Sequence, residues 1–567
     1  MISVENIIEQ RLPRIAGGRP AIRKTATALL KHLFHEHEFK QFAKEYPYLK
    51  GTDFVDKVLE YFEFSYQVNP LERERIPVDG SVVIAANHPI GSLDGLALLK
   101  AVGEIRSDVK VVANELLYAI EPLRSLLFPV NNMGGRNSRE NLKAIEQHLQ
   151  DGGALIIFPA GEVSRISPRG IRDGRWKNGF IKFAEKTHSP IVPVHINARN
   201  SLFFYAMSLL ARPLSTLMLV DEMFKQTSGQ CNLRIGHAVS SNALKELPLH
   251  AGGKSRLLRK HVYKLGKRGG RGELCFLPQM QTVAHPEDRQ LLRKEIRSCQ
   301  SLGKTRDGME MVCYRYNGDS PVMRELGRLR ELSFRAVGEG TGKRRDIDRY
   351  DAYYQHILLW DDTALELVGA YRLMPVSEVT EEQGIYSASL FDYSEDAKAM
   401  LSEGVELGRS FVQPAYWGKQ GLDYLWQGVG AWLAANPQVR YAFGPVSLSN
   451  ALPNEAKSHI VSFYQTHYGM QEGFVSPKRP YQANAEIKYA GDDVKAEFVS
   501  LKERLTAMGE SVPTLYKQYT ELCEHGATRF AAFNVDPDFA DCIDGLVICD
   551  ITQMKASKRK RYLGDSS

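Results

Sequence analysis

Cysteine is scarce in this sequence, and none of it is arranged to bind a metal. The chain has 7 cysteines among 567 residues, with no CxxC pair and no histidine partner at the spacing of a zinc site. We therefore expect no bound metal. Scattered free thiols fit a reducing cytoplasm best. The cysteines are Cys231, Cys275, Cys299, Cys313, Cys523, Cys542 and Cys549.

A long apolar run is also missing. Residues 1–20 carry acids and arginines without an apolar core, which excludes a secretory signal in this stretch. The most apolar stretch, residues 201–220, is interrupted by Arg212 and Pro213, which argues against a spanning helix. Any action on lipids is therefore expected to take place at the membrane surface.

One basic stretch near the middle of the chain contains no acid. The formal net charge is only +6, so the placement of charge says more about partners than its total. Anionic lipid, an acidic carrier protein and nucleic acid are candidate partners, and a solvated linker is the alternative. Nucleic acid is the weakest of these, because the stretch lacks the interleaved aromatic residues of a single-strand platform. The basic residues are Lys254, Arg256, Arg259, Lys260, Lys264, Lys267, Arg268 and Arg271.

The length predicts more than one domain, because a single core stops growing well below 567 residues. Beyond residue 80, short continuous apolar runs alternate with helical patterns, which is typical of a mainly parallel sheet buried on both faces. We predict an α/β protein with two sheet domains. The predicted parts are a helical region at 1–80, a first sheet domain at 81–250, a basic linker at 251–285 and a second sheet domain at 286–567. The runs are 82–86, 109–113, 154–159 and 191–196.

A histidine and an aspartate follow the first of these runs. Asn87, His88 and Asp94 occur in AANHPIGSLDG, at a strand end that opens into a glycine-bearing loop. A carboxylate that orients a histidine allows the imidazole to take the proton of an attacking hydroxyl. We predict that His88 is a general base oriented by Asp94. The alternative is that these side chains cap helices or satisfy backbone groups.

Four sequence blocks in this region resemble the glycerol-phosphate and lysophosphatidate acyltransferase family. They are the Asn-His…Asp segment, residues 130–136, Phe158 to Arg165, and the Val-Pro-Val strand at 191–194. The resemblance implies O-acyl transfer from an acyl thioester to a hydroxyl. Two departures stand out: five residues separate His88 from Asp94 where most of the family has four, and Ala160 replaces a glutamate, with Glu162 displaced by two positions.

The family binds the anionic head of its acceptor with the third block and with the arginine ahead of it. The resemblance therefore implies that Arg136 and Arg165 bind this head, because guanidinium pairs with phosphate or carboxylate in bidentate geometry. Asn87 and Glu162 are further candidates for substrate binding. Gly161 is predicted to be a turn glycine that lets backbone amides approach a ligand. Surface salt bridges are the alternative for the two arginines.

A second set of blocks resembles the acyl-homoserine-lactone synthase branch of the GNAT superfamily. The resemblance is closer still to the ornithine N-acyltransferases of bacterial ornithine-lipid synthesis. It implies that the second domain transfers an acyl group to an amine. The blocks are 329–335, 346–351, 368–374, 384–392, 405–412 and 513–545.

Charged residues within these blocks are the candidates for the second site. Asp348 and Asp351 suit the ammonium of an amino acid, and helix capping or salt bridging is the alternative reading. Arg372 is a further substrate-binding candidate. Glu406 is the predicted base or water-holder, and Arg409 is predicted to orient it or to contact the phosphopantetheine. A structural ion pair is the alternative for Glu406 and Arg409.

The loop at 413–421 bears on the acyl donor. Acetyltransferases bind the pyrophosphate of coenzyme A with a glycine-rich loop at a helix start, but here the loop reads YWGKQG. This degenerate loop favours an acyl-carrier protein, which shares the phosphopantetheine arm and lacks the nucleotide. Acyl-coenzyme A remains the alternative donor, and no tightly bound cofactor is expected.

Together the resemblances imply a bifunctional ornithine-lipid synthase. The second domain transfers a 3-hydroxyacyl group to the α-amine, and the first domain then esterifies the new hydroxyl. The expected location is the cytoplasmic face of the bacterial inner membrane, with peripheral attachment to anionic lipid. Lysine, glutamine and glycine remain alternative amino acids. The rival functions are a lysophospholipid O-acyltransferase with an inactive GNAT-like domain and a non-catalytic membrane-surface protein.

Overall fold

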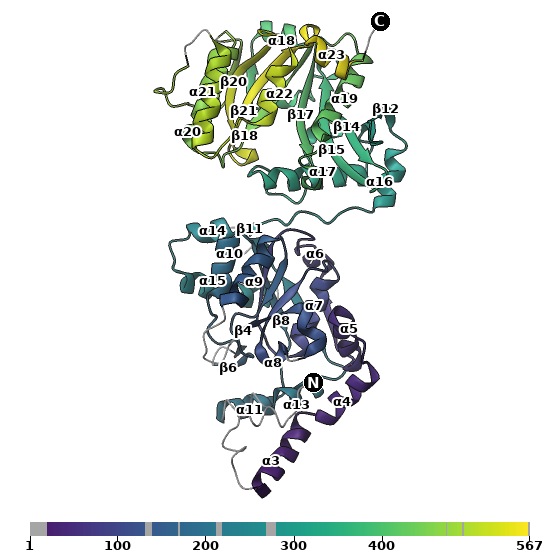
Figure 1. Cartoon of the computed structure of the whole chain (residues 1–567), viewed down its shortest axis with the longest axis vertical. Helices are drawn as coiled ribbons and strands as arrows, with labels where there is room; N and C mark the ends of the chain where they lie inside the picture. The colour runs from purple at the N-terminus through teal and green to yellow at the C-terminus, as the bar shows by residue number, and fades with distance from the viewer. Residues whose placement is uncertain are drawn as a thin grey trace. The chain divides into compact units, whose positions relative to one another are not determined.

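The computed structural model divides the chain into two compact units, residues 1–282 and 283–567 (Figure 1). The described residues are 20–118, 120–130, 139–167, 170–210, 218–267, 279–471, 473–489 and 493–564. Arg136, which was predicted to bind an anionic head group, lies outside the described residues.

Unit 1 is built on a nine-stranded sheet in the order β1-β9-β8-β2-β5-β3-β4, with β10 paired to β8 and β11 to β10. The central pairs are parallel and β8–β9 is antiparallel, so the predicted mainly parallel sheet is confirmed. The strands are β1 (Ser65–Val68), β2 (Val82–Ala86), β3 (Lys110–Asn114), β4 (Leu127–Val130), β5 (Ala154–Ile157), β8 (Ile191–Asn197), β9 (Gln230–Ile235), β10 (Ala238–Val239) and β11 (Gln279–Met280). A separate hairpin joins β6 (Arg165–Ser167) to β7 (Gly170–Arg172).

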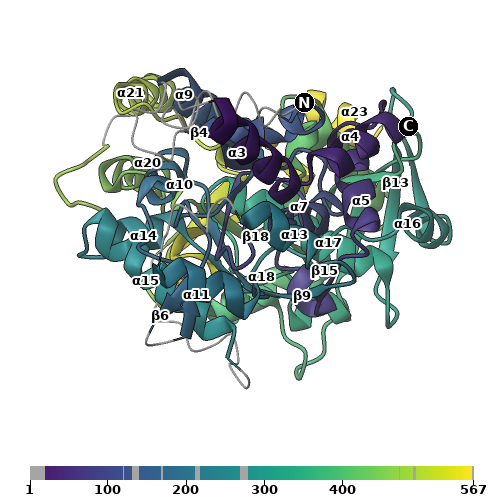
Figure 2. The same ribbon diagram turned by 90° about the horizontal axis from the view of Figure 1, so that it is seen from below.

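Helices surround this sheet. They are α3 (Pro20–Leu33), α4 (Glu36–Glu45), α5 (Gly51–Tyr61), α6 (Pro70–Arg73), α7 (Leu93–Gly103), α8 (Glu115–Tyr118), α9 (Arg139–Gln150), α10 (Gly179–Thr187), α11 (Leu202–Leu210), α13 (Leu219–Phe224), α14 (Ser241–Glu246) and α15 (Ala251–Leu265), with the 3-10 helix η1 (Glu121–Leu126). Viewed from below, α3, α11 and α13 come forward at one end of unit 1 (Figure 2).

The central strand β2 shows why the predicted runs are continuously apolar. Every residue of β2 is buried. Val82, Ile84 and Ala86 join one core with residues of α5 and α7, whereas Val83 and Ala85 join a second core with residues of α9, α10 and α15. Because helices cover both faces of the strand, no position along it can be polar.

Among the described residues of the predicted helical region, 20–80, most are helical, but residues 65–68 are not. They form β1, an edge strand that runs parallel to β9. The sequence SYQV alternates polar and apolar side chains, and Tyr66 and Val68 pack against the core. An alternating pattern suits an edge strand that is covered on one face.

The prediction of a basic linker at 251–285 is wrong for residues 251–265. These residues form helix α15, which packs against the sheet of unit 1. Leu258 and Val262 lie in the core, and the ammonium of Lys254 lies 2.7 Å from a carboxylate oxygen of Glu185 on α10. Although the run contains no acid, Lys254 has an acidic partner on another helix.

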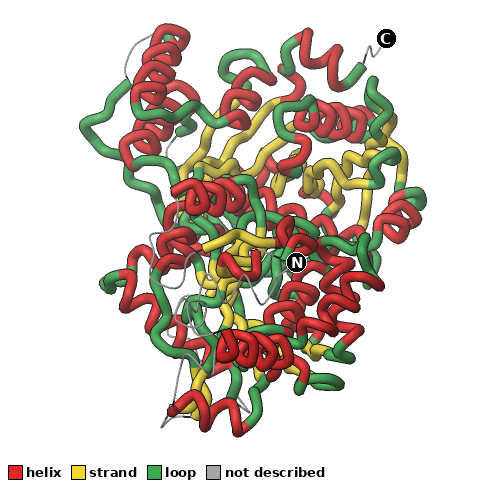
Figure 3. The backbone as a smooth tube through the Cα atoms, turned by 60° about the horizontal axis from the view of Figure 1, so that its bottom comes forward, coloured by secondary structure: helices red, strands yellow, loops and turns green. Residues whose placement is uncertain are grey.

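Unit 2 contains an eight-stranded sheet in the order β12-β13-β14-β15-β17-β18-β21-β20. Figure 3 shows its strands in yellow between red helices. The strands are β12 (Gln300–Lys304), β13 (Glu310–Arg315), β14 (Gln355–Asp361), β15 (Glu366–Pro375), β17 (Gly404–Val412), β18 (Tyr441–Leu448), β20 (Thr528–Asp536) and β21 (Cys542–Asp550). A smaller pair joins β16 (Phe391–Tyr393) to β19 (Val475–Pro477).

The helices of unit 2 cover both faces of its sheet. α17 packs in one core with β13, β14 and β15, and α19 packs in a second core on the same strands. The helices are α16 (Arg289–Ile296), α17 (Pro321–Ala336), α18 (Glu395–Leu401), α19 (Gly421–Ala434), α20 (Asn454–Tyr468), α21 (Val494–Ala507), α22 (Thr514–Leu522) and α23 (Ala556–Tyr562). The 3-10 helices are η2 (Arg349–Ala352), η3 (Val376–Glu378), η4 (Tyr386–Ser389), η5 (Pro414–Tyr416), η6 (Pro537–Phe539) and η7 (Ile551–Gln553).

The sheet of unit 2 splits between β17 and β18. These two strands are its one parallel pair, and they are joined only at Gly404, Val405 and Glu406. Beyond Glu406, β18 remains paired with β21, while β17 pairs only with β15. The split exposes one edge of β17 inside the domain, and Gly408 on that edge faces open space.

Within the described parts of the chain, no helix combines the length and the apolar character needed to cross a membrane.

The contact between α19 and α23 generates a stability prediction. A Cβ atom at Gly430 would lie 2.1 Å from the carbonyl oxygen of Tyr562, so Gly430→Ala forces the two helices apart. We expect a loss of about 1–3 kcal/mol of stability, seen as a lower midpoint in calorimetric thermal unfolding. Gly179→Ala is the control, because its Cβ meets nothing within 4 Å. An unchanged midpoint for Gly430→Ala would contradict the packing.

Candidate active sites

A histidine and an aspartate meet where β2 leads into α7. His88 lies two residues beyond β2, and Asp94 is the second residue of α7. The Nδ1 atom of His88 lies 3.0 Å from Oδ2 of Asp94. Gly91 in the intervening loop has a φ of +90°, and a Cβ there would lie 3.3 Å from the Cβ of Val163. A glycine therefore lets the longer loop turn in the space available.

Asp94 is buried within a shell of backbone amides. Its Oδ1 accepts hydrogen bonds from the amides of Gly91, Ser92 and Gly95, at 3.0–3.1 Å. Its Oδ2 accepts one from the amide of Ile90 at 3.0 Å. Burial raises the pKa of Asp94, but the charge and hydrogen bond of His88 and the amides outweigh it, so the pKa lies below its ordinary value.

His88 is surrounded by Phe158, Asp94 and Asp173. Its ring stacks on Phe158, with centroids 4.1 Å apart. Burial lowers the pKa of His88, but the charge and hydrogen bond of Asp94 and the charge of Asp173 outweigh it, so the pKa lies above its ordinary value. Nδ1 faces Asp94, and no described residue hydrogen-bonds to Nε2. Nε2 is therefore the ring atom placed to take a proton from a hydroxyl.

Asp173 is a site residue that the sequence did not reveal. Its Oδ1 accepts hydrogen bonds from the backbone amide of His88 at 3.2 Å and from the Ser164 hydroxyl at 2.5 Å. Trp176 donates to its Oδ2 at 2.8 Å. Burial raises the pKa of Asp173 despite these bonds. The carboxyl thus joins the histidine loop to the block at 158–165, and no local motif marks it.

The remaining candidates of unit 1 serve different roles. Gly161 has a φ of +69°, as a turn glycine should. Glu162 is half-exposed and accepts a hydrogen bond from Nε of Arg165 at 3.3 Å, while Nη1 of Arg165 donates to the Ser208 hydroxyl on α11. Both side-chain atoms of Asn87 bond to the backbone of Ile196 on β8, at 2.7 and 2.9 Å. Asn87 therefore fixes the end of β2 against β8 through its oxygen and one of its two N–H donors.

Glu406, in unit 2, is the last residue of β17 that pairs with β18. It is buried, and its oxygens accept hydrogen bonds from the amides of Tyr386 at 2.9 Å and Ser387 at 2.7 Å. The Tyr354 hydroxyl donates a further hydrogen bond. The carboxylate holds helix η4 against β17, and these contacts occupy much of the acceptor capacity that a base needs.

Asp348 and Asp351 adopt the capping and salt-bridging arrangement. The two residues form a capping box around η2. Nη1 of Arg372 lies 2.7 Å from Asp348 and 3.1 Å from Asp351, and Nη1 of Arg330 lies 2.7 Å from Asp351. Burial would raise the pKa of Asp351, but Arg330 and Arg372 hold it far below its ordinary value. Arg330 lies in the block at 329–335 but was not predicted to be a site residue, because its burial cannot be recognised from the sequence.

Arg372 and Arg409 flank a cluster of tyrosines. The Arg372 guanidinium lies over the rings of Tyr354 and Tyr386, at 5.0 and 5.2 Å from their centroids. Arg409 donates to the Tyr386 hydroxyl at 3.2 Å and lies 3.2 Å from Asp346. Its φ of +49° is uncommon for arginine and bends β17 beside the split.

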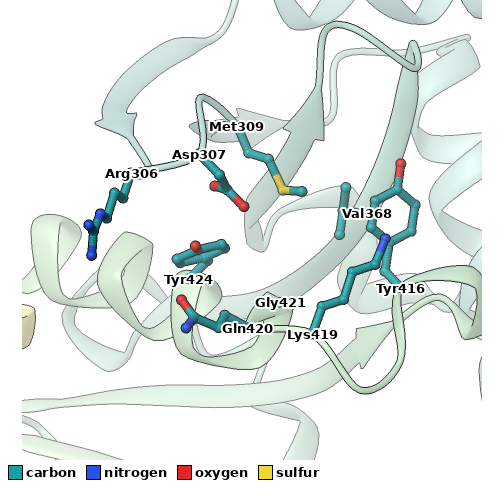
Figure 4. A pocket seen from close by; sticks show the side chains of 9 residues that line it. All are labelled: Arg306, Asp307, Met309, Val368, Tyr416, Lys419, Gln420, Gly421 and Tyr424. Atoms are coloured by element: carbon teal, nitrogen blue, oxygen red, sulfur yellow. The ribbon is translucent and has the colours of Figure 1, made fainter.

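A cavity of about 460 Å³ opens at the start of α19. Figure 4 shows Tyr424 and Lys419 on one side of it, with Asp307 and Met309 opposite. The Lys419 ammonium lies 4.7 Å above the ring of Tyr416. The cavity therefore combines an apolar lining with cations and the amino end of a 14-residue helix. Its other lining residues are Arg306, Val368, Gln420 and Gly421.

Comparison with known proteins places both units among acyltransferases. A family model described as Acyltransferase matches residues 7–268, and one described as Acetyltransferase (GNAT) domain matches residues 329–427. A glycine N(alpha)-acyltransferase of Phocaeicola vulgatus is 30% identical over 308 residues, which are 50% of this chain and 93% of that protein. A lyso-glycine lipid O-acyltransferase of the same organism is 31% identical over 247 residues, covering 42% of this chain and 86% of that protein.

An L-ornithine N(alpha)-acyltransferase of Agrobacterium fabrum is 30% identical over 244 residues, covering 42% of this chain and 78% of that protein. The chain is therefore an acyltransferase with an O-acyltransferase domain and a GNAT domain. The chain belongs to two families, that of the lyso-glycine lipid O-acyltransferases and that of the glycine and ornithine N(alpha)-acyltransferases.

Proposed function

We propose that the chain makes an ornithine lipid in two acyl transfers. Unit 2 transfers a 3-hydroxyacyl group to the α-amine of ornithine, and unit 1 esterifies the 3-hydroxyl of the product. One observation carries this proposal. A single chain covers 93% of a glycine N(alpha)-acyltransferase and 86% of a lyso-glycine lipid O-acyltransferase of the same organism, and it also covers 78% of an L-ornithine N(alpha)-acyltransferase. The first reaction supplies the hydroxyl that the second consumes.

His88 is the proposed base of the O-acyl transfer. Its Nε2 takes the proton of the lyso-lipid hydroxyl while the oxygen attacks the thioester carbonyl. The imidazolium so formed lies 3.0 Å from the Asp94 carboxylate, which stabilises it. The proton then passes to the departing thiolate, so the carbon–oxygen ester bond replaces the carbon–sulfur bond without another reactant.

The N-acyl transfer is assigned to the split between β17 and β18. Backbone groups of β17 are unpaired there, and Gly408 leaves room beside them. A thioester arm in the split brings its carbonyl next to Glu406 and Arg409. The contacts of Glu406 with Tyr386 and Ser387 favour a positioning role over the base that the sequence suggested.

The first functional prediction is that the two sites fail separately. His88→Ala should lower O-acylation by about 10²- to 10⁴-fold, because the general base is lost, so the mono-acylated N-acyl lipid accumulates. Glu406→Ala should block amide formation, because η4 is released from β17, yet externally supplied lyso-lipid should still be esterified. Mass spectrometry of the lipids made by each purified full chain reads both steps.

Activity of the other unit shows that each variant chain is intact, and the midpoint of thermal unfolding reports whether the altered unit is folded. His188→Asn is a matched histidine control: His188 is exposed at the C-cap of α10 with a φ of +53°, which asparagine tolerates. Diacylated product at the parent rate from a folded His88→Ala chain would show that His88 is not the base.

The second functional prediction concerns the acyl donor. We propose acyl-carrier protein, because the cavity at α19 offers Lys419 and Arg306 but no glycine-rich loop of amides for a pyrophosphate. In the His88→Ala full chain, kcat/KM for N-acylation should be at least about 10-fold higher with 3-hydroxyacyl-carrier protein than with the coenzyme A thioester. Equal or better rates with coenzyme A would refute this donor.

The third functional prediction is peripheral attachment to an anionic membrane. Leu202 and Phe203 on α11 are 84% and 59% exposed, while their neighbours Phe204 and Tyr205 pack on Val163 beside the histidine loop. Burying two such side chains in lipid contributes about 1.5–3 kcal/mol each. A double change to serine should therefore lower vesicle binding by at least about 10-fold.

Leu71→Ser is the matched control for this change, because Leu71 is an exposed leucine on the separate helix α6. In membrane fractions, high salt or carbonate should release the unaltered protein. Retention through carbonate, or unchanged binding of the Leu202 and Phe203 double variant to phosphatidylglycerol vesicles, would contradict attachment through α11.

A further inference from the structure

Three largely buried arginines of unit 2 are matched one for one by aspartates. Every one of these arginines has an aspartate oxygen within 3.2 Å. The charges of the three arginines and the three aspartates therefore cancel. The arginines are Arg330, Arg372 and Arg409, and the aspartates are Asp346, Asp348 and Asp351.

Three further carboxylates lie across the split without an ion-pair partner among the described residues. Asp544 is in β21, Asp536 ends β20, and Glu339 follows α17. Asp536 pairs with Cys542, two residues from Asp544, so their side chains share one face of the sheet. Ser447 on β18 pairs directly with Asp544 and donates a hydrogen bond to Glu339 at 3.1 Å. No described lysine, arginine or histidine forms an ion pair with any of the three.

Asp544 is the most unusual of the three. It is 5% exposed, and its carboxyl accepts no hydrogen bond from any described residue. Burial raises its pKa, and the charges of Asp536 and Glu339 raise it further. A carboxyl in such a place is costly to ionise, so a ligand that supplies positive charge and stabilises the ionised form is favoured there.

The three carboxylates lie next to the split that we assign to amide formation. The hydroxyl of Tyr386 lies 3.3 Å from Asp536 and 3.2 Å from Nη1 of Arg409. Arg409 also lowers the pKa of both Asp544 and Glu339, which places its charge near them. One tyrosine therefore links the carboxylates to the arginine that flanks β17.

We propose that Glu339, Asp536 and Asp544 bind the side-chain ammonium of a diamino acid and so select the acceptor. An ammonium has three N–H donors and no acceptor, which suits three carboxylates. The α-amine does not suit this place, because it must lose its proton to attack, whereas nearby carboxylates keep an amine protonated. The same contacts therefore protect the side-chain amine from acylation and direct the acyl group to the α-nitrogen.

This inference rests on the proposed N-acyl transfer, and substrate pairs separate the two. The His88→Ala full chain is given a 3-hydroxyacyl thioester with ornithine or with norvaline, which has the same carbon chain and no side-chain ammonium. We expect kcat/KM to be at least about 100-fold higher for ornithine, with acylation confined to the α-nitrogen. Equal rates overturn the inference and leave the N-acyl transfer standing, while no amide from any amino acid overturns both.

Asp544→Asn tests the residues themselves. The preference for ornithine over norvaline should fall below about 10-fold, while the norvaline rate stays at its parent value and reports an intact fold. Without substrate, the variant should melt at the same or a higher temperature, because a neutral amide replaces a carboxyl that is costly to ionise in this place. Glu339→Gln should shift the preference in the same direction.

Asp392→Asn is the control, because Asp392 is an exposed carboxylate on β16 that lies 3.7 Å from Lys478. It should keep both the rate and the preference. Loss of the norvaline rate together with a lower melting temperature in Asp544→Asn would make Asp544 a structural residue and overturn the assignment.

Discussion

A buried carboxylate has to be compensated where it lies, and this constraint organises both units. Asp94 receives backbone amides and a histidine, Glu406 receives two amides and a tyrosine, and Asp351 receives two arginines. Each compensation ties a loop to the end of a strand. The geometry of both candidate sites therefore follows from neutralising charge inside an apolar sheet protein.

The two units meet this constraint with different sheets. In unit 1, β2 is buried on both faces, so polar chemistry is possible only beyond its end, where His88 and Asp94 lie. In unit 2, the antiparallel sheet splits after Glu406, so a ligand can reach the interior between two strands. The candidate site of unit 1 therefore lies at the end of a parallel strand, and the candidate site of unit 2 lies between two separated strands.

Local patterns predicted the geometry of the unit 1 site well. The strand, the glycine loop and the Asn-His…Asp segment are contiguous, so the pairing of His88 with Asp94 could be expected. Asp173 could not be, because it reaches the His88 amide from 85 residues away. The basic run of α15 was wrongly predicted to be a linker, since the acid that pairs with Lys254 lies on another helix. Charge compensation over such separations leaves no local signal.

The sequence by itself determined the class of this protein: two α/β domains, an O-acyltransferase and a GNAT, because buried strands and their flanking motifs are contiguous along the chain. Only the tertiary structure decided which charged residues lack an ion-pair partner. Asp348 and Asp351 look like ammonium ligands in sequence, but arginines neutralise them. Asp544 lies in the block at 513–545, but nothing in that block marks it as a site residue. It is buried without an ion-pair partner among the described residues, because its surroundings are assembled from β18, β20 and β21 only once the sheet has formed.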